Sequence, residues 1–138
     1  MGLYEMFGTD KDAESRGIWV HFGGGVSVHM KRSGGSNAAF KARVERLHRE
    51  NRRSIELGVM TDDELRPQMI ELYATTVLLD WKGVTDRSGK EMAFNKKNVV
   101  QVLTDLPEFF DEIRAESAKL ENFRVITAEE TGKNSQTS

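Results

Sequence analysis

The stretch IWVHFGGGVSVHM, residues 18–30, decides the fold class of this chain. Apolar residues alternate with other residues on both sides of three glycines, which is the period of a β-strand on each side of a turn. We therefore predict a β-hairpin over residues 18–32, with Trp19 opposite His29 and His21 opposite Ser27. The face that this hairpin would bury consists of Ile18, Val20, Phe22, Val26, Val28 and Met30.

An isolated two-stranded hairpin is marginally stable in water, so helices must cover its apolar face. The rest of the chain shows helical spacing of apolar residues and suitable end signals. Thr61 and Glu64 have the spacing of a capping box, Asn95 is a suitable N-cap, and Pro107 suits the first position of a helix. The predicted helices span residues 37–57, 62–81, 95–106 and 107–122, and Pro67 makes the first turn of the second one irregular.

The fold class that follows is mainly α with an N-terminal β-hairpin (α+β), with about four helices packed as a small bundle on the hairpin. We expect a single globular domain over residues 18–124. Residues 83–94 form a connection in which Val84 and Met92–Phe94 can pair as a small hairpin. Residues 1–17 read as a flexible arm or as a segment that docks on a partner, and residues 125–138 as a disordered tail.

The composition excludes several classes of protein. The chain has 138 residues, no cysteine, three histidines and a formal charge of −2. Disulfides and cysteine-based metal sites are therefore excluded. No apolar run approaches the length of a membrane span, and the N-terminus lacks the pattern of a secretory signal. We expect an intracellular protein without a cofactor and without membrane contact.

The sequence offers no recognisable catalytic or metal-binding arrangement. His21 and His29 fall on the same outer face of the hairpin, but no carboxylate accompanies them, so they make a poor metal site. No Ser–His–Asp or Cys–His arrangement and no metalloprotease motif is present. We predict no catalytic residue and no metal ligand, and hence a protein that is not an enzyme.

The predicted helix 37–57 carries a basic face. Residues 31–53 contain eight lysines and arginines against two glutamates, and residues from 61 onward contain ten basic and fifteen acidic residues. The face lacks the aromatic groups that nucleic-acid binding would use, so contact with solvent or with an acidic surface is favoured. The opposite charges of the two halves also suit head-to-tail self-association. The basic face consists of Arg43, Arg46, Arg49 and Arg53.

The chain has more apolar residues on its helices than one core can bury. Residues 78–81 (LLDW) and 106–110 (LPEFF) either turn between two core layers or form a groove for a partner helix. Trp19, on the outer face of the hairpin, is either covered by another part of the chain or offered to a partner. Trp81 is also a candidate for an architectural role, with Asp80, in closing the end of helix 62–81. The candidate partner-contact residues are Trp19, Leu79, Trp81, Leu106, Phe109 and Phe110.

Four segments of this chain resemble the tail assembly chaperone family of long-tailed bacteriophages and prophages. The pattern combines a hydrophobic LLDWxGV segment, a glycine-lysine turn before an asparagine, an LPxFFxxI corner and a terminal NFR, over about residues 38–124. Proteins of that family carry a small hydroxyl residue where this chain has Phe94–Lys97, a departure that Asn95 can compensate as a helix cap. The positions that carry the resemblance are Leu78, Leu79, Asp80, Trp81, Gly83, Val84, Gly89, Lys90, Phe94, Asn98, Leu106, Pro107, Phe109, Phe110, Ile113, Asn122, Phe123 and Arg124.

The resemblance implies an assembly factor rather than an enzyme. Such a protein binds the tape measure protein in the host bacterial cytoplasm, keeps it soluble while tail tube subunits polymerise, and is absent from the finished virion. It also implies that a longer frameshifted form, which contacts the tail tube protein, could arise at Lys133-Asn134. Two alternatives remain open: a head–tail connector or tail-completion protein, and a small nucleic-acid-binding regulator that uses the basic helix.

Overall fold

The hairpin around the three glycines is present, as predicted. The computed structural model describes residues 2–119, 122 and 123. Strand β1 (Ile18–Gly23) pairs antiparallel with β2 (Val26–Met30), and the pairs Trp19–His29 and His21–Ser27 are confirmed. The register shifts between His21 and Gly23, so that Gly23 pairs with Val26 and the connecting loop is one residue shorter than a simple three-glycine turn.

The predicted helix 62–81 is wrong in its last turn. Helix α4 (Asp62–Thr76) ends early, and Leu78–Lys82 forms a third strand, β3, that pairs antiparallel with β2. A register shift in this pair lets Leu78 and Trp81, three residues apart, both face the core. A β-bulge thus reproduces the three-residue spacing that is typical of a helix, which explains the error.

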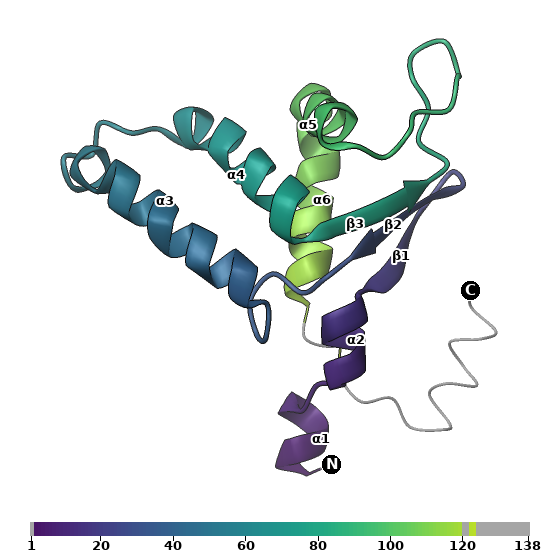
Figure 1. Cartoon of the computed structure of the whole chain (residues 1–138), viewed down its shortest axis with the longest axis horizontal. Helices are drawn as coiled ribbons and strands as arrows, with labels where there is room; N and C mark the ends of the chain where they lie inside the picture. Colours follow the sequence, from purple (N-terminus) through teal and green to yellow (C-terminus); the bar gives the residue numbers. More distant parts are fainter. Residues whose placement is uncertain (1, 120–121, 124–138) are drawn as a thin grey trace.

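Buried residues of α4, α5 (Lys96–Asp105) and α6 (Pro107–Ala118) pack on one face of this three-stranded sheet, whose order is β1-β2-β3. Helix α5 packs against α4, and α6 follows directly after a corner at Leu106. Figure 1 shows α5 at the upper end of α6. The predicted α+β fold class is confirmed. The buried apolar core consists of Val28, Met30, Ile70, Leu72, Tyr73, Val77, Leu78, Trp81, Val84, Val99, Val102, Leu103, Phe110, Ile113 and Phe123.

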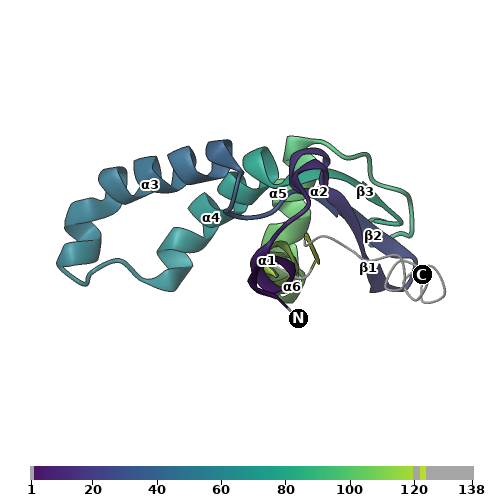
Figure 2. The same cartoon turned by 90° about the horizontal axis from the view of Figure 1, so that it is seen from below.

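Helices α3 (Ala38–Glu56) and α4 form an arm that projects from the sheet (Figures 1 and 2). No residue of α3 is buried, and only Phe40 and Val44 of this helix pack against the core. Asn37 anchors the arm at its base, where its Nδ2 donates to the carbonyl oxygens of Arg32 and Thr76 at 3.0 and 2.9 Å. Most of helix α3 is therefore accessible to solvent.

Most predicted helix ends are confirmed. The side chains of Asn37, Thr61 and Asn95 each accept a hydrogen bond from the backbone amide three residues further on, as N-caps do. Pro107 occupies the first turn of α6, where no backbone amide is needed. Helix α6 ends at Ala118, before the predicted end at residue 122.

The N-terminal segment, predicted as a flexible arm or as a segment that docks on a partner, is largely helical. It contains two short helices, α1 (Leu3–Phe7) and α2 (Lys11–Arg16). The Asp10 amide donates to the carbonyl oxygen of Phe123 at 2.7 Å, and buried Glu14 accepts from Arg32 Nη1 at 2.8 Å. These contacts hold α2 against segments that are distant in the sequence, at Arg32 and Phe123. The predicted tail, residues 125–138, lies outside the described residues.

The connection of residues 83–94 is the predicted small hairpin. The amide of Met92 donates to Val84, and Thr85 forms a bridge with Glu91. The strand β3 leads into it through Gly83, which has a φ of +76° and lies against the backbone of Gly25.

We expect Gly83→Ala to destabilise the protein more than Gly89→Ala, although both glycines have a positive φ, +76° and +84°. The left-handed backbone alone costs an alanine about 1 kcal/mol at each position. A Cβ at Gly83 would also collide with the carbonyl oxygen of Gly25, whereas a Cβ at Gly89 meets open space. Relief of that collision should cost about 1–3 kcal/mol more. Urea unfolding of both variants measures the difference, and equal losses would contradict the close approach of Gly83 to Gly25.

Glu14 should make stability depend on pH. Burial by itself raises its pKa, but hydrogen bonds from Arg32, Thr9 and Ser36 outweigh that effect and hold the pKa below the ordinary value of 4.5. The stabilisation is complete above the unfolded-state pKa and is lost as the pH falls through the lowered folded-state pKa. We expect Glu14→Gln to lower the melting temperature at pH 7, and we expect this loss to shrink as the pH falls through the lowered pKa of Glu14. Glu5→Gln, at an exposed position of α1, is the control, and a Glu14→Gln effect that does not change with pH would refute the assignment.

Candidate functional site

The structure separates the six predicted partner-contact residues. Trp81 and Phe110 belong to the core, with 7% and 0% of their surface exposed. The Trp81 ring meets Phe94 edge to face and its Nε1 donates to the carbonyl oxygen of Met92 at 2.8 Å. Phe110 packs edge to face on Tyr73. These two candidate contact residues are therefore buried in the core, and Trp81 lies on β3 rather than at the end of a helix.

Leu106 and Phe109 lie instead in an open groove at the corner between α5 and α6, which we call the corner groove. Leu106 is 54% exposed, and half-buried Phe109 packs edge to face on Phe22 with their ring centroids 5.4 Å apart. The groove has two hollows of about 410 Å³ each, which share Thr85, Val102 and Leu106. The first hollow is lined further by Phe22, Gly23, Val26, Gly83, Val84, Glu108, Phe109 and Glu112, and the second by Asp86, Arg87, Ser88, Met92, Gln101 and Asp105.

The rim of the corner groove is acidic. Four carboxylates line it, those of Asp86, Asp105, Glu108 and Glu112, against one basic side chain, Arg87. Hydrogen bonds from the Ser88 hydroxyl and from backbone amides of the turn lower the pKa of Asp86, so this carboxylate stays ionised. The groove therefore combines an apolar floor with a net negative edge.

Leu79 and Trp19 lie away from the corner groove. Leu79, 37% exposed, points to the other side of β3 from Trp81, and its side chain lies close to Gly17. Trp19 stacks on His29 with ring centroids 4.9 Å apart, and Lys82 Nζ lies 4.3 Å from the Trp19 ring centroid. Trp19 is therefore half-buried on the outer face of the sheet, where His29 and Lys82 cover part of its ring.

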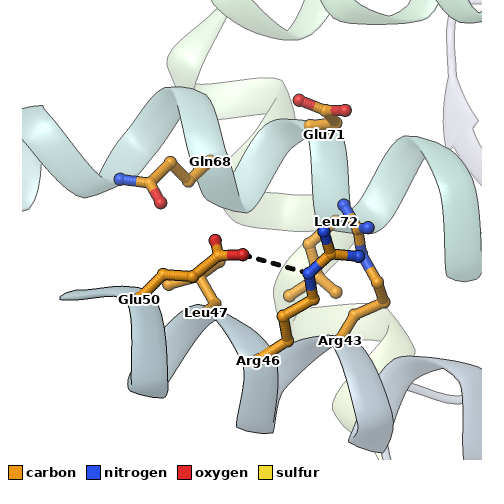
Figure 3. A pocket seen from close by; sticks show the side chains of 7 residues that line it. All are labelled: Arg43, Arg46, Leu47, Glu50, Gln68, Glu71 and Leu72. Carbon is orange, nitrogen blue, oxygen red and sulfur yellow. Dashed lines mark hydrogen bonds and ion pairs between the residues drawn. The ribbon is translucent and has the colours of Figure 1, made fainter. Parts of the chain in front are cut away.

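The four predicted basic residues do not converge on one cavity. Arg43 and Arg46 line a narrow cleft of about 130 Å³ between α3 and α4, in which Arg46 Nε lies 3.0 Å from Glu50 Oε1 (Figure 3). Arg49 lines a separate hollow along α3 with His48, and Arg53 is exposed. Arg52, between them, is paired with Glu56 at 3.2 Å. Glutamates one turn away therefore neutralise part of the basic face.

Three residues that line the groove, Phe22, Val84 and Val102, are not among the predicted partner-contact residues, and Val84 and Val102 belong to the buried core beneath it. Phe22 lies on the face of the hairpin that the sequence predicts to be buried. Only the tertiary arrangement brings the hairpin tip, the loop after β3 and the helix corner together, so no local pattern marked them.

Within the part of the chain that the structure describes, no group of three or more histidine, cysteine or carboxylate side chains is arranged to hold a metal ion. No helix among the described residues is long and apolar enough to cross a membrane.

Comparison with known families gives one match, to the YdaY prophage protein family, over residues 35–134. The chain belongs to this family. The match covers both helices of the arm, β3 and the helices that form the corner groove, and it begins after the hairpin. Comparisons with curated proteins and with solved structures gave no match. Membership of the YdaY family makes this chain a prophage protein, which agrees with the phage origin that the resemblance implies.

Proposed function

We propose that this YdaY-family prophage protein is a tail assembly chaperone. It binds the tape measure protein, keeps it soluble in the host bacterial cytoplasm while the tail tube polymerises, and does not remain in the virion. The proposal is of a binding protein without catalytic activity and without a cofactor.

The observation that carries the proposal is the corner groove. A holdase needs apolar surface that is open to a client, and Leu106 and Phe109 provide it between two hollows. These two residues, together with Val84, belong to the positions that carry the resemblance to tail assembly chaperones. Other positions of the same pattern, including Trp81, Phe110 and Phe123, are buried.

The decisive experiment is co-expression with the tape measure protein from the same prophage gene cluster. We expect the tape measure protein to stay in the soluble fraction and to co-elute with this chain, and to precipitate without it. Precipitation in both cases would contradict the proposal for this form of the protein. A form lengthened by frameshifting near Lys133-Asn134, which lies outside the described residues, would then be the one to test for binding of the tail tube protein.

A structural head–tail connector or tail-completion protein would also be expected in a prophage, but it would remain in the particle. Mass spectrometry of purified virions separates the two functions, because a chaperone should be absent. The nucleic-acid regulator is less favoured, since Arg46 and Arg52 are already paired with glutamates. Self-association through oppositely charged surfaces remains a prediction, to be measured by light scattering at low and high salt.

A further inference from the structure

We infer that the corner groove selects client segments that are basic amphipathic helices, with Leu106 inserted between two apolar side chains of the client. This inference rests on the proposed function and specifies the chemistry of the client segment.

The shape of the floor favours a helix. Leu106 stands between two hollows that share it as a common wall, and just over half of its surface is exposed. Side chains three or four residues apart on a helix lie about 5–6 Å from each other and point the same way. One such pair can straddle Leu106 and place one apolar side chain in each hollow. Each hollow of about 410 Å³ has room for a large aliphatic or aromatic side chain.

The charge of the rim favours a basic client. Glu108 and Glu112 are one turn apart on α6, and both are exposed at the first hollow. Asp105 lies at the second hollow, at the end of α5. Lysines or arginines beside the apolar stripe of a client helix would lie against these carboxylates, and an acidic helix of the same apolar pattern would be repelled.

A second copy of this chain is the less suitable occupant. Its basic helix is α3, in which Arg46 and Arg52 already pair with glutamates of the same helix. Two strongly exposed apolar residues, Leu57 and Val59, follow the C-terminal end of α3. They lie outside the helix, so they do not form an apolar stripe along it. A separate polypeptide with unpaired basic residues would complement the acidic rim of the groove better than a second copy of this chain does.

The test uses the full chain and two labelled helical peptides with the same leucine positions, one flanked by lysines and one by glutamates. Fluorescence anisotropy should show binding of the basic peptide about tenfold or more tighter than that of the acidic one. Its affinity should fall as salt rises. Equal affinity for the two peptides, or no saturable binding of the basic one, would overturn the inference.

Two matched pairs of variants locate the binding. Leu106→Asp should weaken binding of the basic peptide about tenfold or more, whereas Leu57→Asp, which alters an equally exposed leucine on the arm, should not. Glu108→Gln/Glu112→Gln should weaken it and flatten its salt dependence, whereas Glu45→Gln/Glu56→Gln removes the same charge from α3 without effect. Equal losses within either pair would place the peptide outside the corner groove.

The same variants separate this inference from the proposed function. If the wild-type chain solubilises the tape measure protein and Leu106→Asp does so equally well, the chaperone function stands and the groove inference fails. If the wild-type chain does not solubilise it, the function fails whatever the peptides do. An oligomer that Leu106→Asp dissociates and Leu57→Asp leaves intact would place a second copy in the groove and overturn the inference.

Discussion

Val28→Asp is expected to unfold the protein at neutral pH. Val28 is fully buried in the central strand β2, between Val20 of β1 and Trp81 of β3. A carboxylate there has no partner, and an uncompensated buried charge costs about 3–5 kcal/mol or more. That cost is comparable to the whole stability of a small domain, roughly 5–15 kcal/mol. The variant should lose its cooperative thermal transition at pH 7, and part of the loss should be recovered near pH 4, where the buried carboxyl can bind a proton.

Ser27→Asp is the control for this substitution. Ser27 is the neighbouring residue on β2, faces the other side of the sheet and lies opposite Lys82. A new carboxylate there gains an opposite charge across the strands and loses the 2.6 Å contact between Ser27 Oγ and His21 Nδ1. The net change in stability should stay within about 1 kcal/mol. If Val28→Asp melted like the wild type, the covered face of the sheet would not be the core.

Phe110→Ala should cost about 3–5 kcal/mol of unfolding free energy, the range found for removal of a fully buried aromatic ring. The ring has no exposed surface and meets Tyr73 edge to face at 5.4 Å between centroids. The guanidinium groups of Arg66 and Arg114 each lie 5.5 Å from its centroid. The substitution therefore opens a cavity among α4 and α6 and also removes a surface on which two cations lie. Urea denaturation with a full baseline at both ends measures the loss.

Phe109→Ala gives the contrasting result one residue away. Phe109 is half-buried and forms a wall of the corner groove with Phe22. We expect a loss of only about 1–2 kcal/mol, because less apolar area leaves contact with the protein. The basic peptide should bind more weakly. If Phe109→Ala destabilised the protein as much as Phe110→Ala, the groove wall would be part of the core and not a binding surface.

The adjacent pair Phe109 and Phe110 illustrates how far the sequence predicts the site. Helical spacing indicates that two consecutive residues differ in direction by about 100°, so one of them faces outward. Local spacing does not tell which of the two faces the core, because that depends on where α4 and the hairpin tip lie. The candidate residues therefore included both, and only burial separates the groove residue from the core residue.

The segment Leu78–Lys82 shows the same limit for the fold. Apolar residues at three-residue spacing predict a helix, yet the free edge of β2 pairs with this segment and a bulge absorbs the spacing. A long-range hydrogen-bonding partner overrides a local period, and the period alone contains no information about that partner. The folded N-terminal segment has a similar origin, since Glu14 and Asp10 are held by Arg32 and Phe123 far along the chain.

The sequence by itself determined the hairpin with its Trp19–His29 pair, the caps at Thr61 and Asn95, the helix start at Pro107 and the α+β class. All of these depend on residues close together in the chain, where backbone geometry and side-chain period act directly. Tertiary structure alone decided that β3 completes the sheet, that Trp81 and Phe110 are core, and that Phe22, Val84, Val102 and Leu106 share one groove. Those outcomes depend on which distant segments bury each other's apolar surface, a cooperative choice that no single segment specifies.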